Sequence, residues 1–249
     1  MTQLTIFLDD GGVINDNAVR GPQWQALIGE FLSPILGGDP AAWAAANEAI
    51  FEQIWGPAFK DYLDGLYGDD FNSWLRDYDL RWLQSMAAAV GVPTPVAEDA
   101  RLRLVRETVT YVTERVRAAY PGAVDAIKWL SVRFRLCTAS NEPSVDLDGY
   151  LRGMGVRHLF EDLYGPDLVG CVKNRPDYYL RAFARTGVEP DQALIVDDSP
   201  GNLAFAVEAG ARTCLVAPAG TPPGGFDLVV QSLADLPPRL EKAGLWAPE

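Results

Sequence analysis

Four short stretches of this sequence carry reactive side chains next to segments with the pattern of a strand or a helix. Three of the stretches follow runs with the composition of β-strands, and the fourth lies in a loop before a helical pattern. In an open parallel sheet, ligands bind beyond the carboxyl ends of the strands. We therefore expect the reactive side chains to converge on one site. They are Asp9, Asp10, Ser140, Asn141, Lys173, Asp197 and Asp198.

The chemistry of this set is that of a metal-assisted phosphate site. The carboxylates of Asp9, Asp197 and Asp198 would repel one another at close range unless a cation lay between them. Mg²⁺ prefers oxygen ligands, keeps several of its waters and often contacts a substrate phosphate. Lys173 would add a fixed positive charge. The hydroxyl of Ser140, with the backbone N–H groups that follow it, would donate to a phosphate oxygen.

Composition and charge exclude several other classes of protein. The chain has 249 residues, with 21 Lys and Arg against 34 Asp and Glu, so its formal net charge is −13. Nucleic-acid backbones are held mainly by clustered Lys and Arg, which makes a nucleic-acid partner unexpected. No segment approaches the ~20 consecutive apolar residues of a membrane helix, and the first residues do not have the pattern of a signal peptide. We expect a cytoplasmic protein that binds neither nucleic acids nor membranes.

The cysteines and the single histidine suggest no other reactive centre. Cys137, Cys171 and Cys214 are far apart in the sequence and form no C-x-x-C pair, so neither a zinc site nor a disulfide framework is expected. Any mechanism that uses a Ser-His-Asp or Cys-His arrangement would depend entirely on His158. We interpret the cysteines as buried apolar residues and His158 as structural.

The elements that must position the reactive residues change in character along the chain. Residues 3–9 read as a strand that ends in a turn at Gly11 and Gly12. From residue 22 to about 118, apolar residues recur at helical spacing, and Gly and Pro divide the stretch into four or five helices. After residue 120, helices and strands alternate, which specifies a parallel sheet covered on both faces. The predicted helices cover 123–131, a stretch through 151, 176–186 and 200–209, and the predicted strands cover 134–139, the surroundings of 163, 193–196, 213–216 and 228–230.

The four reactive stretches resemble, in order and approximate spacing, the motifs of the haloacid dehalogenase (HAD) superfamily. Residues 7–14 (FLDDGGVI) are similar to its nucleophile loop, 136–141 (LCTASN) to its second motif, 173–179 (KNRPDYY) to its third and 193–202 (ALIVDDSPGN) to its acidic fourth motif. The resemblance covers residues 4–16 and 120 to about 240. It implies an α/β fold with a Rossmann-like parallel sheet core over 1–16 and 119–249 and an inserted α-helical cap domain over 17–118.

The resemblance also implies a role for each residue of the site. Asp9 would be the nucleophile and form an aspartyl-phosphate that water then hydrolyses. Ser140, Asn141 and Lys173 would hold the phosphoryl group, with Ser140 and Lys173 counted among the catalytic residues. The implied cofactor is Mg²⁺, which would stabilise the charge that develops in the reaction. Its implied ligands are Asp9, the backbone carbonyl of Gly11, Asp198 and, directly or through water, Asp197.

One position departs from the pattern of the family. Its phosphatases usually carry a second Asp two residues after the nucleophile, which protonates the leaving group, and here that position is Gly11. A positioned general acid is worth roughly 10²–10⁴-fold in rate. We therefore expect slow turnover, a substrate with a good leaving group, or a substitute acid such as Asp16 or Asp10.

Three functions follow from these observations. The first is a Mg²⁺-dependent hydrolase, a phosphatase that cleaves a small phosphorylated molecule, and the cap would close over the site and select the substrate. The second is a metal-independent 2-haloacid dehalogenase, in which Asp9 attacks the carbon that carries the halide. The third is a catalytically weakened protein that binds a phosphorylated ligand, which only Gly11 supports. The acidic pair Asp197-Asp198 favours the first function. Nothing in the sequence specifies the oligomeric state.

Overall fold

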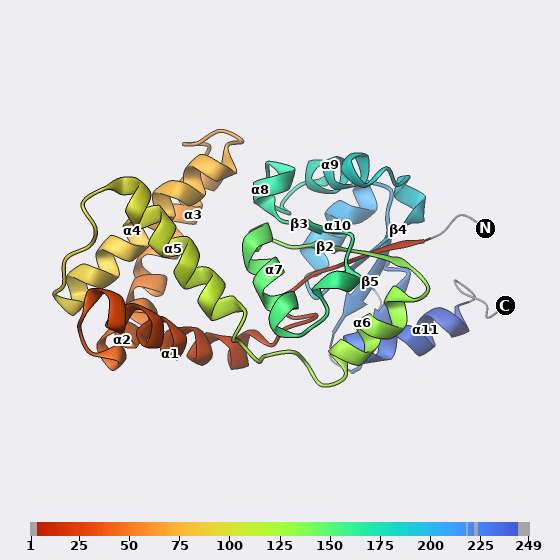
Figure 1. Ribbon diagram of the computed structural model, residues 1–249. Helices are drawn as coiled ribbons and strands as arrows, with labels where there is room; N and C mark the ends of the chain where they lie inside the picture. The colour runs from red at the N-terminus through yellow and green to blue at the C-terminus, as the bar shows by residue number, and fades with distance from the viewer. Residues whose placement is uncertain (1–3, 218, 222–223, 244–249) are drawn as a thin grey trace. The chain divides into compact units, whose positions relative to one another are not determined.

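The first strand of the structure, β1 (Thr5–Leu8), is separated from the second, β2 (Arg135–Ala139), by a long helical segment. The computed structural model describes residues 4–217, 219–221 and 224–243. It divides the chain into unit 1, residues 1–17 and 118–249, and unit 2, residues 18–117. The described strands all belong to unit 1, and Figure 1 shows unit 2 as helices. The chain thus leaves the sheet after one strand and returns to it about 100 residues later.

Unit 1 is built on a parallel sheet of six strands in the order β3-β2-β1-β4-β5-β6. In the centre of the sheet, Leu8 of β1 pairs with Thr138 on one side and Val196 on the other. The carboxyl end of β1 therefore lies between the carboxyl ends of β2 and β4. The remaining strands are β3 (Asp162–Tyr164), β4 (Ala193–Asp197), β5 (Arg212–Val216) and β6 (Leu228–Val230).

Each face of the sheet has its own core, because side chains along a strand point alternately to the two faces. Ile6 and Leu8 of β1 belong to one hydrophobic cluster, whereas Phe7 between them belongs to the other, and all three are fully buried. Burying one such side chain stabilises the fold by about 1.5–3 kcal/mol. Helices cover both faces, as Figure 1 shows. On the first face they are α6 (Ala123–Ser131), α7 (Ser144–Gly153) and α11 (Leu236–Lys242), and on the second α8 (Pro166–Val169), α9 (Pro176–Thr186) and α10 (Pro200–Glu208).

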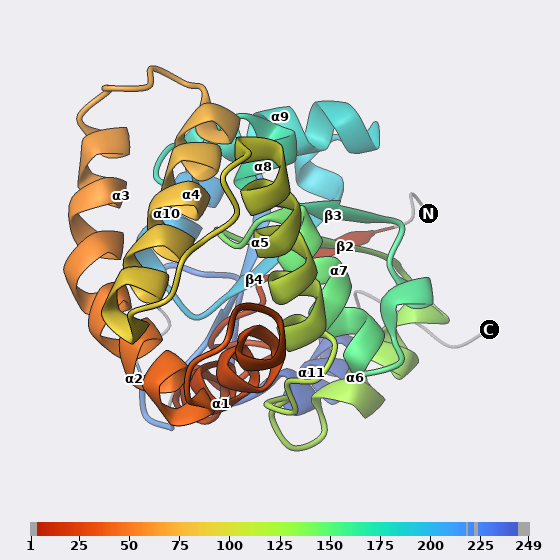
Figure 2. The same ribbon diagram turned by 60° about the vertical axis from the view of Figure 1, so that its left-hand side comes forward.

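Among its described residues, unit 2 consists of five α-helices and one π-helical turn, η1 (Phe51–Trp55). Capping residues set the ends of these helices. Asp39 caps the start of one helix by accepting the Ala41 N–H, and Gly91, at φ 80°, ends another. Trp43 and Trp74 fill space between these helices, since both are almost fully buried. Figure 2 shows the helices α1 (Asn17–Leu36), α2 (Pro40–Ile50), α3 (Gly56–Leu63), α4 (Phe71–Val90) and α5 (Glu98–Thr113).

The predicted alternation of helices and strands is confirmed, with small differences at the ends of elements. Helices 123–131 and 176–186 and strand 228–230 have the predicted bounds. The strand predicted to end at residue 196 extends by one residue, so Asp197 is the last residue of β4. Two short helices, α8 and α11, were not predicted. The first has four residues, and the second begins Leu-Pro-Pro, a pattern that reads as a loop although Pro is accepted in a first helical turn.

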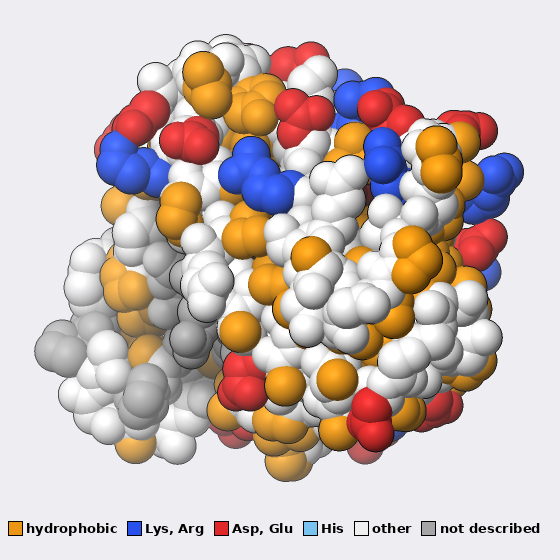
Figure 3. Space-filling model, turned by 90° about the vertical axis from the view of Figure 1, so that its left-hand side faces the viewer, with side chains coloured by type: hydrophobic (Ala, Val, Ile, Leu, Met, Phe, Trp, Pro, Cys, Tyr) orange, Lys and Arg blue, Asp and Glu red, His pale blue; other side chains and the backbone are white. Residues whose placement is uncertain are grey.

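The surface carries both signs of charge. On the face that Figure 3 shows, acidic and basic side chains lie next to one another along the upper part, and hydrophobic side chains are scattered among polar ones. Across the described residues, every helix is too short or too polar to cross a membrane.

Candidate active site

Lys173 connects the carboxyl ends of three neighbouring strands. Its Nζ lies 3.0 Å from Oδ1 of Asp9, which follows β1, and 2.7 Å from Oδ2 of Asp197, which ends β4. It also donates to the backbone carbonyl of Ala139, at the end of β2, over 2.9 Å. The side chain of Lys173 is 1% exposed. One buried ammonium group therefore fixes the positions of the nucleophile candidate and of one acidic partner.

The charges around Lys173 determine its protonation. Burial by itself lowers the pKa of Lys173, but the carboxylates of Asp9 and Asp197 raise it more, so the pKa lies above its ordinary value. The group is therefore an ammonium at neutral pH. It serves as a permanent positive charge and cannot act as a base.

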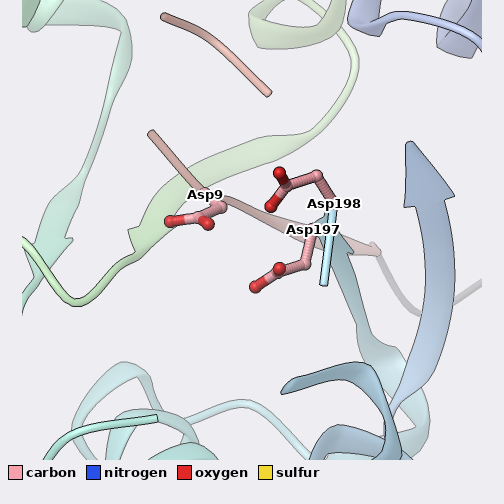
Figure 4. Close-up of side chains that lie close together, drawn as sticks. All are labelled: Asp9, Asp197 and Asp198. Atoms are coloured by element: carbon pink, nitrogen blue, oxygen red, sulfur yellow. The ribbon is translucent and has the colours of Figure 1, made fainter. Parts of the chain in front are cut away.

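The carboxylates of Asp9, Asp197 and Asp198 form one acidic cluster, drawn in Figure 4. Each contributes an oxygen atom, and these atoms lie within 4.8 Å of one another. Burial, together with the charge of Asp9, raises the pKa of Asp197 to about 6 against the opposing charge of Lys173. The same two causes raise the pKa of Asp198. Three carboxylates beside one ammonium leave an excess of negative charge, and their oxygen atoms are the donors that Mg²⁺ prefers. The residues present fit such an ion.

The two acids of the fourth motif differ in their surroundings. Asp197 is fully buried, and its Oδ1 accepts the backbone N–H of Ser199 over 2.8 Å while Asn202 Nδ2 lies 3.4 Å from each carboxylate oxygen. Asp198 is exposed and lies directly over Gly12, where a Cβ would come within 2.1 Å of Asp198 Oδ2. The contacts of Asp197 fix its orientation, whereas Asp198 is the more accessible of the two to a bound ion.

Ser140 and Asn141 are held next to this cluster by backbone and side-chain contacts. Ser140 is 2% exposed, and its N–H donates to the Tyr164 carbonyl over 3.1 Å. Oδ1 of Asn141 accepts the backbone N–H of Lys173 over 2.8 Å. The second and third motifs are thus linked directly. The side-chain oxygen of Asn141 thus bonds to the protein itself, and the amide nitrogen is the other polar end of this side chain.

A comparison with known proteins identifies the family. The model of the haloacid dehalogenase-like hydrolases matches residues 5–210. This chain belongs to that family. It is 34% identical over 118 residues to the phosphoglycolate phosphatase of Rhodospirillum rubrum, a match that covers 46% of this chain and 49% of that protein. It is 32% identical over 130 residues to protein CbbY of Cereibacter sphaeroides, covering 51% and 56% of the two chains. The chain spans about half the length of these curated relatives.

Solved structures of the family share its fold. The 2-haloacid dehalogenase from Pseudomonas syringae pv. tomato DC3000 superposes with a TM-score of 0.63 at 19% identity, over 97% of this chain and 100% of that one. The predicted α/β core with an inserted helical domain is thereby confirmed. At this identity the likeness concerns the fold alone.

In this haloacid dehalogenase-like hydrolase, the residues after Asp9 form a closed turn. Asp10 is fully buried, and its carboxylate accepts a hydrogen bond from Asn15 Nδ2 over 2.8 Å. The backbone carbonyl of Asp10 accepts the N–H groups of Ile14 and Asn15. Asp10 therefore stabilises the turn and is not part of the acidic cluster. Asp16 is partly exposed, and its N–H donates to Ala118 over 2.8 Å.

Two residues that hold the site lie within the third and fourth motifs, but no role is predicted for either of them from the sequence. Tyr178 is fully buried, and its hydroxyl lies 3.1 Å from the Ser140 carbonyl and 2.8 Å from that of Tyr164. Asn202 contacts Asp197, as described above. Asn202 is the last residue of the fourth motif and lies in the first turn of a helix that Ser199 caps. Nothing in the sequence distinguishes Tyr178 from an ordinary core tyrosine.

Proposed function

We propose that this chain is a Mg²⁺-dependent phosphatase that cleaves a small phosphate monoester through an aspartyl-phosphate. The observation that carries the proposal is the buried Lys173, which holds Asp9 and Asp197 while Asp198 completes an acidic cluster beside them. The name of the Rhodospirillum rubrum relative, a phosphoglycolate phosphatase, supports the same class of substrate. Negative charge in excess of the one ammonium supports a divalent cation.

Each residue has a distinct part in the proposed reaction. An oxygen of Asp9 attacks phosphorus and forms the aspartyl-phosphate, while the bond from phosphorus to the alcohol oxygen breaks and its electron pair leaves with that oxygen. Water then attacks the phosphorus, which releases inorganic phosphate and restores the Asp9 carboxylate. Lys173 neutralises charge on Asp9 and on the phosphoryl group, and Ser140 and Asn141 donate to phosphoryl oxygens.

The proposal includes a set of ligands for the metal, of which three are the carboxylates of the acidic cluster. Asp9, Asp198 and the carbonyl of Gly11 would hold Mg²⁺, and Asp197 would act directly or through water. The ion, when bound, stabilises negative charge on the phosphoryl group. Asp197 also positions Lys173, because its carboxylate accepts from Nζ over 2.7 Å.

We propose that unit 2 is the cap that selects the substrate. Its insertion point supports this role, because the chain leaves unit 1 within ten residues of Asp9. A helical unit connected there is suited to cover the site and exclude water from it.

The purified chain tests the proposal on a panel of phosphate monoesters that includes phosphoglycolate, and on 2-chloropropionate. We expect phosphate release with Mg²⁺, its loss with EDTA and its recovery when Mg²⁺ is restored. Asp9→Asn, which keeps the size of the side chain but removes the nucleophile, should bring release to the background. Metal-independent release of chloride would instead establish a dehalogenase, and binding of phosphate without turnover would establish a ligand-binding protein.

A further inference from the structure

The loop between β2 and α7 carries the side chains proposed to bind phosphate, and unit 1 holds its first half through several contacts. The Ala139 carbonyl accepts from Lys173 Nζ, the Ser140 N–H donates to Tyr164, and Asn141 Oδ1 accepts the Lys173 N–H. Tyr178 contacts the Ser140 carbonyl over 3.1 Å. These contacts fix residues 139–141, and in the second half of the loop the Glu142 N–H donates to Ser140 Oγ over 3.3 Å.

The second half of the loop has a further support in Asp167, in the first turn of α8. Its Oδ1 accepts the backbone N–H of Ser144 over 2.8 Å, and its Oδ2 accepts the Ser144 hydroxyl over 2.5 Å. Ser144 is the first residue of α7, and the residue at the N-cap position is Pro143, whose side chain has no acceptor for the free N–H groups of the helix. Asp167 thus provides from another segment the cap that the local sequence lacks.

Gly165 brings the two segments close enough for this contact. A Cβ at position 165 would lie 2.3 Å from the Glu142 carbonyl oxygen and 2.8 Å from the Ser144 nitrogen. Real Cβ atoms do not approach backbone atoms so closely, so the loop lies directly against the glycine. The segment 165–167 therefore acts as a template that sets the path of residues 142–144.

We propose that Asp167 is a positioning residue for phosphate binding, which acts by fixing Ser144 and through it the loop that carries Ser140 and Asn141. The inference rests on the proposed phosphatase function. For the removal of Asp167, this positioning role and simple electrostatics predict opposite changes in phosphate affinity. Removing a carboxylate near an anion site would tighten phosphate binding through reduced repulsion. Removing a support of the binding loop would instead weaken phosphate binding.

The test compares the wild-type chain with Asp167→Ala, Asp167→Asn and Ser144→Ala. The readouts are kcat, KM for the best monoester found, the inhibition constant of inorganic phosphate, and the unfolding temperature. For Asp167→Ala we expect KM and the phosphate inhibition constant to rise roughly 10-fold, because charge-assisted hydrogen bonds that hold the loop are lost. We expect kcat to change much less, since Asp9 and Lys173 are untouched.

The remaining variants separate positioning from general destabilisation. Asp167→Asn keeps an oxygen that accepts the Ser144 N–H, so its effect should be intermediate. Ser144→Ala loses only the hydroxyl contact, and in the double variant with Asp167→Ala it should add nothing further. Asp125→Ala, an exposed acid in the first turn of α6, is the matched control and should leave KM unchanged.

The outcomes also separate this inference from the proposed function. If the wild type releases phosphate but Asp167→Ala and Asp167→Asn leave KM and the inhibition constant unchanged or lower, the positioning role is wrong and the phosphatase stands. If the wild type neither releases nor binds inorganic phosphate under calorimetric titration, the proposed function fails and this inference with it. If it binds phosphate without turnover, the phosphate dissociation constants of the same variants decide the positioning role.

Discussion

The side chains around Asp9 stabilise charge at the site, but they are poorly suited to transfer a proton to a leaving group. Lys173 forms ion pairs with two carboxylates and donates to a carbonyl, and Asp10 is buried against Asn15. The residue two positions after Asp9 is Gly11, which has no side chain to transfer a proton. In the proposed reaction, the departing oxygen would therefore carry much of its negative charge in the transition state. The rate should then depend strongly on how stable that oxygen is as an anion.

Gly11→Asp tests this dependence. With 4-nitrophenyl phosphate, whose leaving group is a stable anion, we expect little change in kcat/KM. With an alkyl ester such as glycerol phosphate, we expect a rise of roughly 10²-fold, the lower end of what a positioned general acid provides. Gly11→Asn has a side chain of the same size without a proton to give, and it should produce no such rise. A wild-type rate that is equal for both esters would contradict the argument, and Asp16→Asn would then show whether Asp16 is the acid.

The site illustrates what the sequence predicts at this scale and what it does not. The convergence of Asp9, Lys173, Asp197 and Asp198 is predicted because each follows or precedes an element of a parallel sheet, and the structure places these residues together. The contact of Asp167 with Ser144 is not predicted. It joins two polar residues 23 positions apart, and each of them alone reads as an ordinary helix-start residue.

At the scale of elements, periodicity predicts those that are long and regular. The helix 176–186 is predicted correctly because it buries one face, with Tyr178, Tyr179 and Phe183 at helical spacing. Helix α8 is too short to show any period. The π-helical turn Phe51–Trp55 reads as a continuous helix, because one extra residue per turn does not alter the apolar pattern enough to be seen. The secondary structure of these two segments depends on packing against neighbouring elements, which the periodicity of the sequence does not show.

Within unit 2, Asp79 of α4 should make the stability depend on pH. Burial raises the pKa of Asp79 to about 7, although the nearby charge of Arg106 lowers it in part. An acid whose pKa is higher in the folded state favours folding when protonated. Its contribution is fully present below its unfolded pKa of about 4 and is lost as pH rises towards 7. Asp79→Asn should therefore raise the unfolding temperature at pH 8 more than at pH 5, as measured by circular dichroism.

The control for this prediction is Asp61→Asn, which makes the same chemical change at an exposed position of α3. It should alter the unfolding temperature little at either pH. Acids in unit 1 titrate in both proteins and cancel when variant and wild type are compared at the same pH. A gain for Asp79→Asn that is equal at pH 5 and pH 8 would show that the carboxyl of Asp79 is already ionised without penalty.

At the scale of the whole molecule, two chain segments connect unit 1 to unit 2, and each unit holds them as a pair. In unit 1, Asn15 and Ala119 form an antiparallel bridge, and the Asp16 N–H donates to Ala118 over 2.8 Å. In unit 2, the side-chain amide of Gln23 accepts the N–H of Arg117 over 2.8 Å and donates to its carbonyl over 3.0 Å. The change in sequence pattern indicates where the insert begins and ends. It does not indicate that residues 94 positions apart join its two connections.

The pairing of Gln23 with Arg117 should protect the return connection from proteolysis. Trypsin cleaves after arginine and needs an extended, unpaired backbone, so cleavage after Arg117 requires that both hydrogen bonds first open. Gln23→Leu, which has a similar shape but neither hydrogen bond, should increase the rate of that cleavage about 30-fold, since the two bonds together contribute roughly 2 kcal/mol. Limited digestion followed by mass spectrometry measures the rate at this bond.

Two further variants serve as controls. Gln23→Glu keeps the acceptor, so its cleavage rate should lie between those of the wild type and Gln23→Leu. Gln25→Leu, two residues further along α1, should be cleaved at the wild-type rate. A rate at Arg117 that is the same in Gln23→Leu as in the wild type would mean that opening of the two bonds does not limit access to this segment.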